Sequence, residues 1–208
     1  MEEAVAMLEE GGEDALQMKE LAERSDVSLS TLYRYFPSKQ HLILTILRER
    51  YLESQGRLSR EQHQGDTVGE RVANYMIRAL RSQQRRPAFS AAVRNALAQA
   101  GPELITLRET VHDAYVGSIR IAAGPMTSAQ LDTLMIVIGV ADFAAGLWLA
   151  GQVSPAEARA HIITASRLLD LPDEAIYADR ELARKAVDHA VGRPGRRAQA
   201  PVDKVSEA

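Results

Sequence analysis

A short stretch between Ser28 and Pro37 gathers side chains that can make several hydrogen bonds and one strong ionic contact. Phosphate oxygens need hydrogen-bond donors, and base edges in a major groove present donors, acceptors and methyl groups. Hydroxyls, phenols and a guanidinium on one short helix meet these needs, so the stretch predicts a surface that contacts nucleic acid. The alternative is a solvated helix with two half-buried tyrosines. The side chains left outside or at the side are Leu29, Ser30, Thr31, Tyr33, Arg34 and Tyr35, with Ser28 as the expected N-cap.

The elements before this stretch can hold it in place. Residues 17–24 predict a short helix, Asp26 and Val27 a tight turn, and residues 28–36 a second short helix. Two short helices joined by a turn of three or four residues are typical of a helix-turn-helix.

Apolar residues at fixed spacing predict how these two helices pack. Ala22 is small where the helices must approach closely, and Val27 is expected to fill the angle between them. Leu32 and Phe36 are four residues apart, so both should turn toward the interior and leave the polar side chains outside. A longer helix should begin at Ser38 and continue to about Ser59, with a mainly buried apolar stripe.

Residues 15–47, ALQMKELAERSDVSLSTLYRYFPSKQHLILTIL, closely resemble the DNA-binding domain of TetR-type transcriptional regulators. Beyond about the first sixty residues the resemblance is architectural, to a long helical domain. It implies a repressor whose two subunits place their third helices in successive major grooves of a palindrome. A small ligand in the larger domain would change the separation of those helices. The matching residues are Leu21, Ala22, Val27, Ser28, Thr31, Leu32, Tyr33, Tyr35, Phe36, Ser38, Lys39 and Leu42.

The resemblance also implies DNA contacts for particular residues of this sequence. Lys39 lies in the first turn of its helix, where an ammonium beside free N–H groups can hold a phosphate. Gln17 and Lys19 would touch the backbone or flanking bases. The full set of expected DNA-binding residues is Gln17, Lys19, Ser28, Ser30, Thr31, Tyr33, Arg34, Tyr35 and Lys39.

Two features depart from the family pattern. Asp26 stands where the family usually has glycine, and aspartate tolerates a left-handed backbone better than most residues. Residues 1–60 carry eight basic and eleven acidic side chains, although phosphate neutralisation supplies much of the affinity for DNA. We expect a first helix that is truncated at Met1, with a native start further upstream.

The composition excludes several classes of function. The 208 residues include no cysteine, which removes disulfides, thiolate zinc sites and cysteine nucleophiles, and fits a cytoplasmic location. The five histidines share no metal-ligand spacing, and the chain has no nucleotide-binding glycine loop or nucleophile-elbow serine. We therefore expect no enzyme, no metal and no cofactor.

Eight prolines divide the chain into blocks of helical length, and no block alternates strictly between apolar and polar residues. Thr67, Thr127 and Ser154 precede helical patterns as N-caps, and Ser154 has a capping-box partner three residues on. The sequence predicts an all-α protein of about nine or ten helices. Its expected parts are a helix-turn-helix DNA-binding domain at 1–47, a helical effector-binding and dimerisation domain at 48–192, and a disordered tail at 193–208.

The larger domain offers candidates for a ligand pocket, although residues of these types are more often plain packing. The expected effector is small and largely apolar, because the candidate lining carries few charges. The sequence is also similar in patches to actinobacterial repressors of sterol catabolism, which implies an acyl-CoA thioester as one effector. The candidate lining residues are Met76, Leu80, Phe89, Val93, Tyr115 and Ile119.

Two helices at about 128–151 and 154–170 are rich in small and apolar residues and predict a four-helix bundle between two subunits. The apolar run at 134–151 approaches the length of a membrane span, but Asp142 interrupts it and no basic flank adjoins it. We expect a homodimer and no membrane. The expected interface residues are Val140, Phe143, Leu147, Ala158, Ile162, Ala165 and Leu169.

One rival function fits the acidic balance of residues 1–60. The protein would then be a helical dimer that binds small molecules or protein partners and has lost DNA binding. Asp142 could in either case serve the ligand, the dimer or only a local hydrogen bond.

Overall fold

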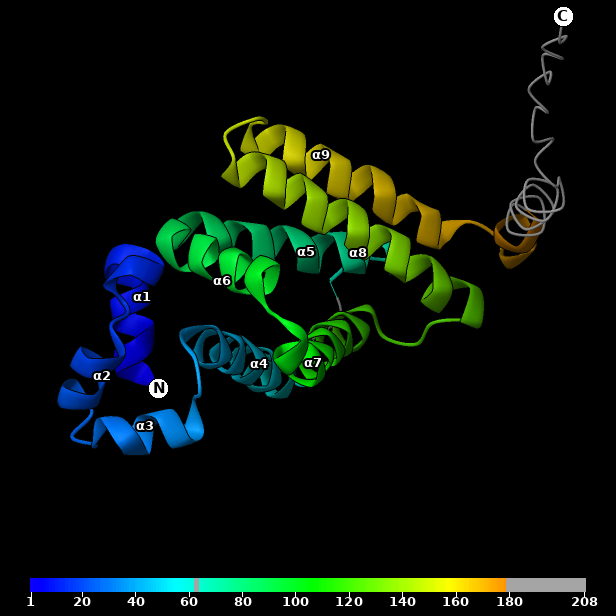
Figure 1. The fold of residues 1–208 in the computed structure, drawn as a ribbon. Helices are drawn as coiled ribbons and strands as arrows, with labels where there is room; N and C mark the ends of the chain where they lie inside the picture. Colours follow the sequence, from blue (N-terminus) through cyan, green and yellow to red (C-terminus); the bar gives the residue numbers. More distant parts are fainter. Residues whose placement is uncertain (62–63, 179–208) are drawn as a thin grey trace, which may run out of the picture. The chain divides into compact units, whose positions relative to one another are not determined.

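The computed structural model describes residues 1–61 and 64–178, and this part of the chain is helical without strands (Figure 1). The predicted all-α class is confirmed. Residues 1–171 form one compact unit, and the described residues after it, 172–178, belong to a second unit. The predicted tail at 193–208 lies outside the described residues. The helices are α1 (Glu2–Ala15), α2 (Met18–Arg24), α3 (Leu29–Tyr35), α4 (Lys39–Leu58), α5 (Val68–Arg85), α6 (Pro87–Gln99), η1 (Pro102–Leu104), α7 (Ile105–Ala123), α8 (Ser128–Leu149), α9 (Pro155–Ser166) and η2 (Arg167–Asp170).

The helix ends confirm the capping residues that the sequence predicts. Ser28 and Ser38 each accept a hydrogen bond from a backbone N–H three residues on. Thr67 caps α5 in the same way, and Thr127 and Ser154 each form a complete capping box. Each such cap satisfies N–H groups that the first turn of a helix leaves unpaired.

The turn before α3 differs from the expectation in one detail. Asp26 adopts a left-handed backbone with φ of 52°, which fits its place in the position that favours glycine. Val27, however, is exposed and does not fill the angle between α2 and α3. Leu21, Ala22 and Leu32 close that angle, because all three are buried in the same apolar cluster.

Two apolar clusters stabilise the unit 1–171. The first joins α1, α2 and α3 to α4 and α6 through buried residues such as Leu8, Leu32 and Phe89. The second joins α5, α7, α8 and α9 through residues such as Leu80 and Ile162. Helix α4 runs across residue 47, so it continues from the helix-turn-helix into the larger helical domain.

Helices α8 and α9 lie side by side (Figure 1), and their packing corrects part of the predicted dimer face. Ala158, Ile162 and Ala165 of α9 and Leu169 of η2 lie in the protomer's own core, because α9 and η2 pack against α5 and α8. Their side chains are already covered within the protomer. On α8, Phe143 is 68% exposed.

Helix α8 is long and apolar enough to cross a membrane by length and composition, with a mean hydropathy of 1.6. Its inner side, including Val137, Ala141 and Ala144, belongs to the core cluster shared with α5, α7 and α9. Its outer side carries Ile136 and Phe143 into the solvent. Core packing thus accounts for much of the apolar character of the helix.

Candidate nucleic-acid interface and ligand cavity

Helix α3 presents its polar side chains to solvent. Tyr33 is 45% and Tyr35 63% exposed, and Arg34 is exposed as well. The guanidinium of Arg34 lies over the Tyr35 ring at 5.2 Å from its centre. Leu32 is buried, so one side of this short helix packs against the rest of the helix-turn-helix domain at 1–47, called the DNA-binding head below. The other side is exposed and can contact a partner.

The start of α3 is tied together by a local network of hydroxyls. The Ser28 Oγ lies 2.9 Å from the Ser30 Oγ and donates to the Thr31 Oγ1 at 2.8 Å. The Thr31 N–H donates to the Ser28 Oγ at 3.1 Å. Ser28 and Ser30 are exposed and Thr31 is half-buried, so the N-terminal turn offers hydroxyl groups beside the phenols.

The outlying residues expected to touch DNA are placed differently from one another. Gln17 and Lys19 are exposed at the start of α2. Lys39 is half-buried, and its Nζ donates to the Glu13 carbonyl at 3.0 Å. The ammonium has two further protons for a phosphate, while this bond attaches the start of α4 to the end of α1.

Acidic groups do not lie on α3 itself. The sequence of Leu29–Tyr35 contains no Asp or Glu, and its one charge is the cation of Arg34. Glu20 on α2 pairs with Arg24 at 2.6 Å. The acidic balance of residues 1–60 therefore comes from other elements.

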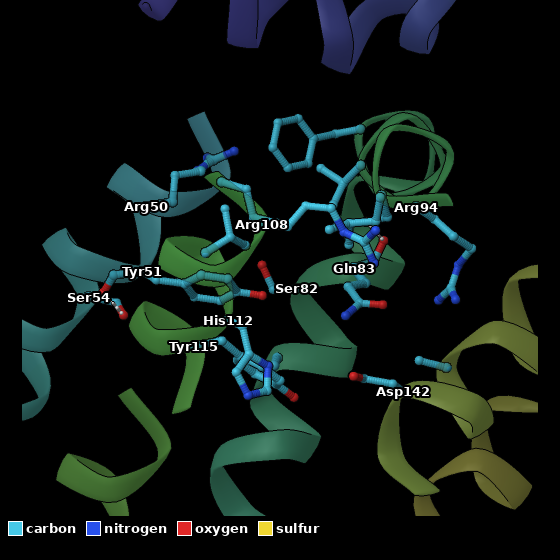
Figure 2. Close-up of a pocket in the computed structure, with 18 of the residues that line it drawn as sticks. Arg50, Tyr51, Ser54, Ser82, Gln83, Arg94, Arg108, His112, Tyr115 and Asp142 are labelled. Carbon is cyan, nitrogen blue, oxygen red and sulfur yellow. Dashed lines mark hydrogen bonds between the residues drawn. The ribbon is translucent and has the colours of Figure 1, made fainter. Parts of the chain in front are cut away.

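A cavity of about 1090 Å³ lies in the larger helical domain, with lining residues from α4, α5, α6, α7 and α8 (Figure 2). Its size is slightly above the range of about 300–1,000 Å³ that is usual for ligand pockets. Leu47, Phe89, Val93 and Leu97 supply apolar walls. Arg50, Arg57, Arg86, Arg94 and Arg108 also line it.

The lining corrects the expectation that few charges face the ligand. The five arginines outnumber the three acidic residues of the wall, which are Glu109, Asp113 and Asp142. Sequence reasoning missed the arginines, because they come from different helices and only the packing brings them together. A local signal for one of them was the pair of arginines at 85–86 directly before Pro87.

Three of the six candidate ligand residues line the cavity, namely Phe89, Val93 and Tyr115. Met76, Leu80 and Ile119 instead lie in the core cluster, with at most 3% of each exposed. The apolar spacing that suggested them marks the buried sides of α5 and α7, and such a side can face either a cavity or another helix.

A group of tyrosines and one carboxylate forms a polar part of the cavity wall (Figure 2). The Tyr115 phenol hydrogen-bonds to the Asp142 carboxylate. Burial raises the pKa of Asp142, while Arg94 and the bond from Tyr115 act in the opposite direction. Burial, together with the charge of Asp142, also raises the pKa of Tyr115 well above its usual value. Asp142 keeps contact with solvent through the open cavity.

Arg94 faces Asp142 from the neighbouring helix α6. Its Nε is buried and has no hydrogen-bond partner among the residues that the structure describes. A β-carbon at Gly146 would lie 3.0 Å from the Arg94 Nη1, so the glycine leaves room for the guanidinium. An acceptor on a ligand would satisfy the orphaned Nε.

An exposed polar helix in a helix-turn-helix, attached through α4 to a domain with a ligand-sized cavity, defines a DNA-binding regulator with an effector domain. The family model of bacterial regulatory proteins of the tetR family matches residues 1–46. The crystal structure of a TetR transcriptional regulator from Rhodococcus sp. RHA1 is similar, with 30% identity and a TM-score of 0.69. The match covers 81% of this chain and 90% of that one. The chain belongs to the TetR family and is a ligand-responsive DNA-binding transcriptional regulator, not an enzyme.

Two curated relatives of similar sequence are also named as transcriptional regulators. The HTH-type transcriptional repressor KstR of Mycobacterium tuberculosis (strain ATCC 25618 / H37Rv) is 28% identical over 188 residues, covering 88% of this chain and 81% of the relative. The repressor of the same name from Mycolicibacterium smegmatis is 29% identical over 176 residues, covering 82% of this chain and 81% of the relative. The predicted similarity to the TetR family and to such repressors is confirmed.

Proposed function

We propose that this protein is a cytoplasmic repressor that binds a palindromic operator as a homodimer through α3 and is released by a small effector in the cavity. The observation that carries the proposal is the exposed side of α3, with Tyr33, Arg34 and Tyr35 free of the core. The relatives named as repressors support the direction of the regulation.

Helix α4 supplies the physical link between the two functions. Its N-terminus lies beside the end of α1, through the bond from Lys39 to Glu13. Its middle carries Arg50 and Tyr51 into the cavity wall. A helix of this length spans about 30 Å, so a ligand that shifts the middle of α4 also moves the end that holds the head.

The dimer in this proposal uses the outer side of α8. Phe143 and Ile136 are exposed there, and Val140 and Leu147 are partly exposed on the same helix. Two α8 helices and the outer side of two α9 helices would form the bundle. The exposed Ile163 is then the contact from α9, in place of the four residues that are buried in the protomer.

The cavity suits an effector with an apolar body and one or more polar groups. Phe89, Val93 and Leu97 can cover the body, while the Tyr115–Asp142 pair and Arg94 can bind a carbonyl, a hydroxyl or an anion. The volume has room for a bulky ligand, and an acyl-CoA thioester remains one candidate.

The proposal is tested by binding to duplex DNA from the region upstream of the gene. We expect a complex of two protomers per site, with an affinity that falls steeply as salt rises, because phosphate contacts release counterions. A slope near zero against salt, or no binding, would favour the rival function of a helical module without DNA binding. Native mass spectrometry of the purified protein would report a retained effector.

A further inference from the structure

One carboxylate of the DNA-binding head reaches two arginines of the effector cavity. The Oε1 of Glu9, on α1, lies 3.2 Å from the Nη1 of Arg86 and 3.8 Å from the Nη2 of Arg50. Arg50 comes from α4, and Arg86 stands between α5 and α6. Both arginines line the cavity. Figure 2 shows Arg50 at the end of the cavity nearest the blue ribbon of the N-terminal segment.

The two guanidinium groups are held close together although they repel each other. Burial and the charge of Arg86 lower the pKa of Arg50, while Glu9 and Glu53 raise it. The Arg50 guanidinium also lies over the Phe89 ring, 4.8 Å from its centre. A pair of cations on a partly desolvated apolar wall needs an anion, and Glu9 supplies it.

We propose that Arg50 and Arg86 form an anion-binding subsite of the cavity, which Glu9 occupies in the effector-free protein. A carboxylate or phosphate group on the effector binds the two arginines in place of Glu9. The displacement loosens α1 from the cavity wall. This inference rests on the proposed function. It specifies that the effector carries an anionic group and that its binding releases the contact between Glu9 and the cavity wall.

The apolar packing of α1 limits how far the displacement of Glu9 can loosen this helix. Ala4, Met7 and Leu8 bury the apolar side of α1 in the cluster that contains Phe89 and Ala92 of α6. Losing the ionic contact therefore leaves the apolar contact in place. The side chains of Glu9, Arg50 and Arg86 are each between 32% and 43% exposed, so solvent weakens both ion pairs of Glu9. By thermodynamic linkage, the anionic effector lowers the affinity for the operator by the same factor by which the operator lowers the affinity for the effector.

The test compares three probes with the same ten-carbon tail, which are decanoate, decyl phosphate and decanol. Calorimetric titration of the free protein, without DNA, measures their affinities. We expect decanoate, decyl phosphate or both to bind more tightly than decanol. Preference between the two anions shows whether the subsite suits a carboxylate or a phosphate.

The key variant is Glu9→Gln, and its control is Glu10→Gln, which removes the same charge from the next residue of α1. Glu10 is exposed and lies 4.0 Å from Arg24, away from the cavity. We expect Glu9→Gln to bind the anionic probe about two- to fivefold more tightly, within the range expected for a part-exposed ion pair. Decanol binding should not change, and Glu10→Gln should match the wild type.

A second readout follows α1 directly. In the wild type, the anionic probe should speed hydrogen exchange at the backbone amides of α1 more than decanol does. In Glu9→Gln, the exchange should already be moderately faster than in the wild type before any probe is added, because the apolar contact of α1 remains. Three results would overturn the inference: equal affinities for decanol and the anions, no anion binding to Glu9→Gln, or no difference between Glu9→Gln and Glu10→Gln. Operator binding by the unliganded wild type is measured separately, so failure of the subsite is distinguishable from failure of the proposed function.

Discussion

The guanidinium carbon of Arg34 lies 5.2 Å from the centre of the Tyr35 ring on the exposed side of α3. Stacking on an aromatic face leaves the N–H groups of the guanidinium free, because they point outward in its plane. The pair thus holds a fork of hydrogen-bond donors at the surface, beside Tyr33. Exposed donors of this kind are what the proposed contact of α3 with a base edge or a phosphate requires.

Removing either of the two central side chains should abolish measurable specific binding to the operator. We expect this of Arg34→Ala and of Tyr33→Ala, because each removes a proposed contact from both subunits of the dimer, and the loss of one good base contact alone costs roughly 1–3 kcal/mol. Fluorescence anisotropy with a labelled duplex measures the loss. Circular dichroism and sedimentation should show unchanged helix content and dimerisation, because both side chains are exposed. Loss of the dimer in either variant would show that α3 is misplaced.

Lys39 should act on every DNA sequence alike. We expect Lys39→Ala to weaken specific and non-specific duplexes by the same factor and to flatten the slope of log affinity against log salt by about one unit. The bond from Lys39 to the Glu13 carbonyl adds a loss of stability, so the thermal midpoint is measured in parallel. A variant whose salt slope equals that of the wild type would remove Lys39 from the phosphate contacts.

Much of the helix-turn-helix can be predicted from the sequence, because its signals are local. The Ser28 and Ser38 caps, the inward side of Leu32 and the left-handed Asp26 all follow from residue types a few positions apart. The prediction that Val27 fills the angle between α2 and α3 was wrong, because Val27 is exposed. Its burial depends on how closely the two helices approach, and this distance cannot be predicted from residue spacing.

The effector cavity and the outer side of the bundle are harder to predict, because they depend on tertiary packing. Arg50, Arg86 and Arg94 belong to different parts of the chain and meet only in the fold. The spacing of Ala158 and Ile162 correctly predicts that one side of α9 is buried. It does not predict whether that side packs against α5 and α8 or against a second subunit.

The two kinds of apolar residue on α8 and α9 should respond differently to substitution. Phe143 is 68% exposed, so Phe143→Ser should dissociate the dimer and leave the protomer folded. Ile162 is 2% exposed, and Ile162→Ala should cost about 2–5 kcal/mol of unfolding free energy because it leaves a cavity in the core. Analytical ultracentrifugation and urea unfolding separate the effects. A Phe143→Ser protein that stays dimeric would move the interface elsewhere.

The start of α5 depends on a contact from the far end of the unit. The Asp170 carboxylate accepts hydrogen bonds from the Gly69 N–H at 2.8 Å and from the Thr67 hydroxyl at 2.9 Å. A β-carbon at Gly69 would lie 2.5 Å from the Ser166 carbonyl oxygen, so Gly69→Ala should displace η2 from α5 and destabilise the fold. Gly56→Ala is the control, because no atom lies within 4 Å of its β-carbon and alanine favours a helix. Thermal unfolding should show a lower midpoint for Gly69→Ala and no loss for Gly56→Ala.

Asp142 should make stability fall as the pH rises. Its pKa is raised above 3.8 by burial, so the native state holds the proton more firmly than the unfolded chain does. The unfolding free energy therefore decreases from about that pH through the raised pKa. We expect Asp142→Asn, which cannot ionise, to gain stability relative to the wild type between acidic and neutral pH. Chemical unfolding at a series of pH values measures the difference in unfolding free energy, and a difference that does not change with pH would show that the pKa of Asp142 is not raised by folding.

In the proposed function, the outer side of α3 lies against a duplex. Anisotropy titrations of DNA from the gene's own upstream region, over a range of salt concentrations, test it with the wild type and the double variant Tyr33→Ala/Arg34→Ala. We expect tight wild-type binding that weakens steeply with salt, and no sequence-specific binding by the double variant. Equal sequence-specific binding by the two proteins would contradict it.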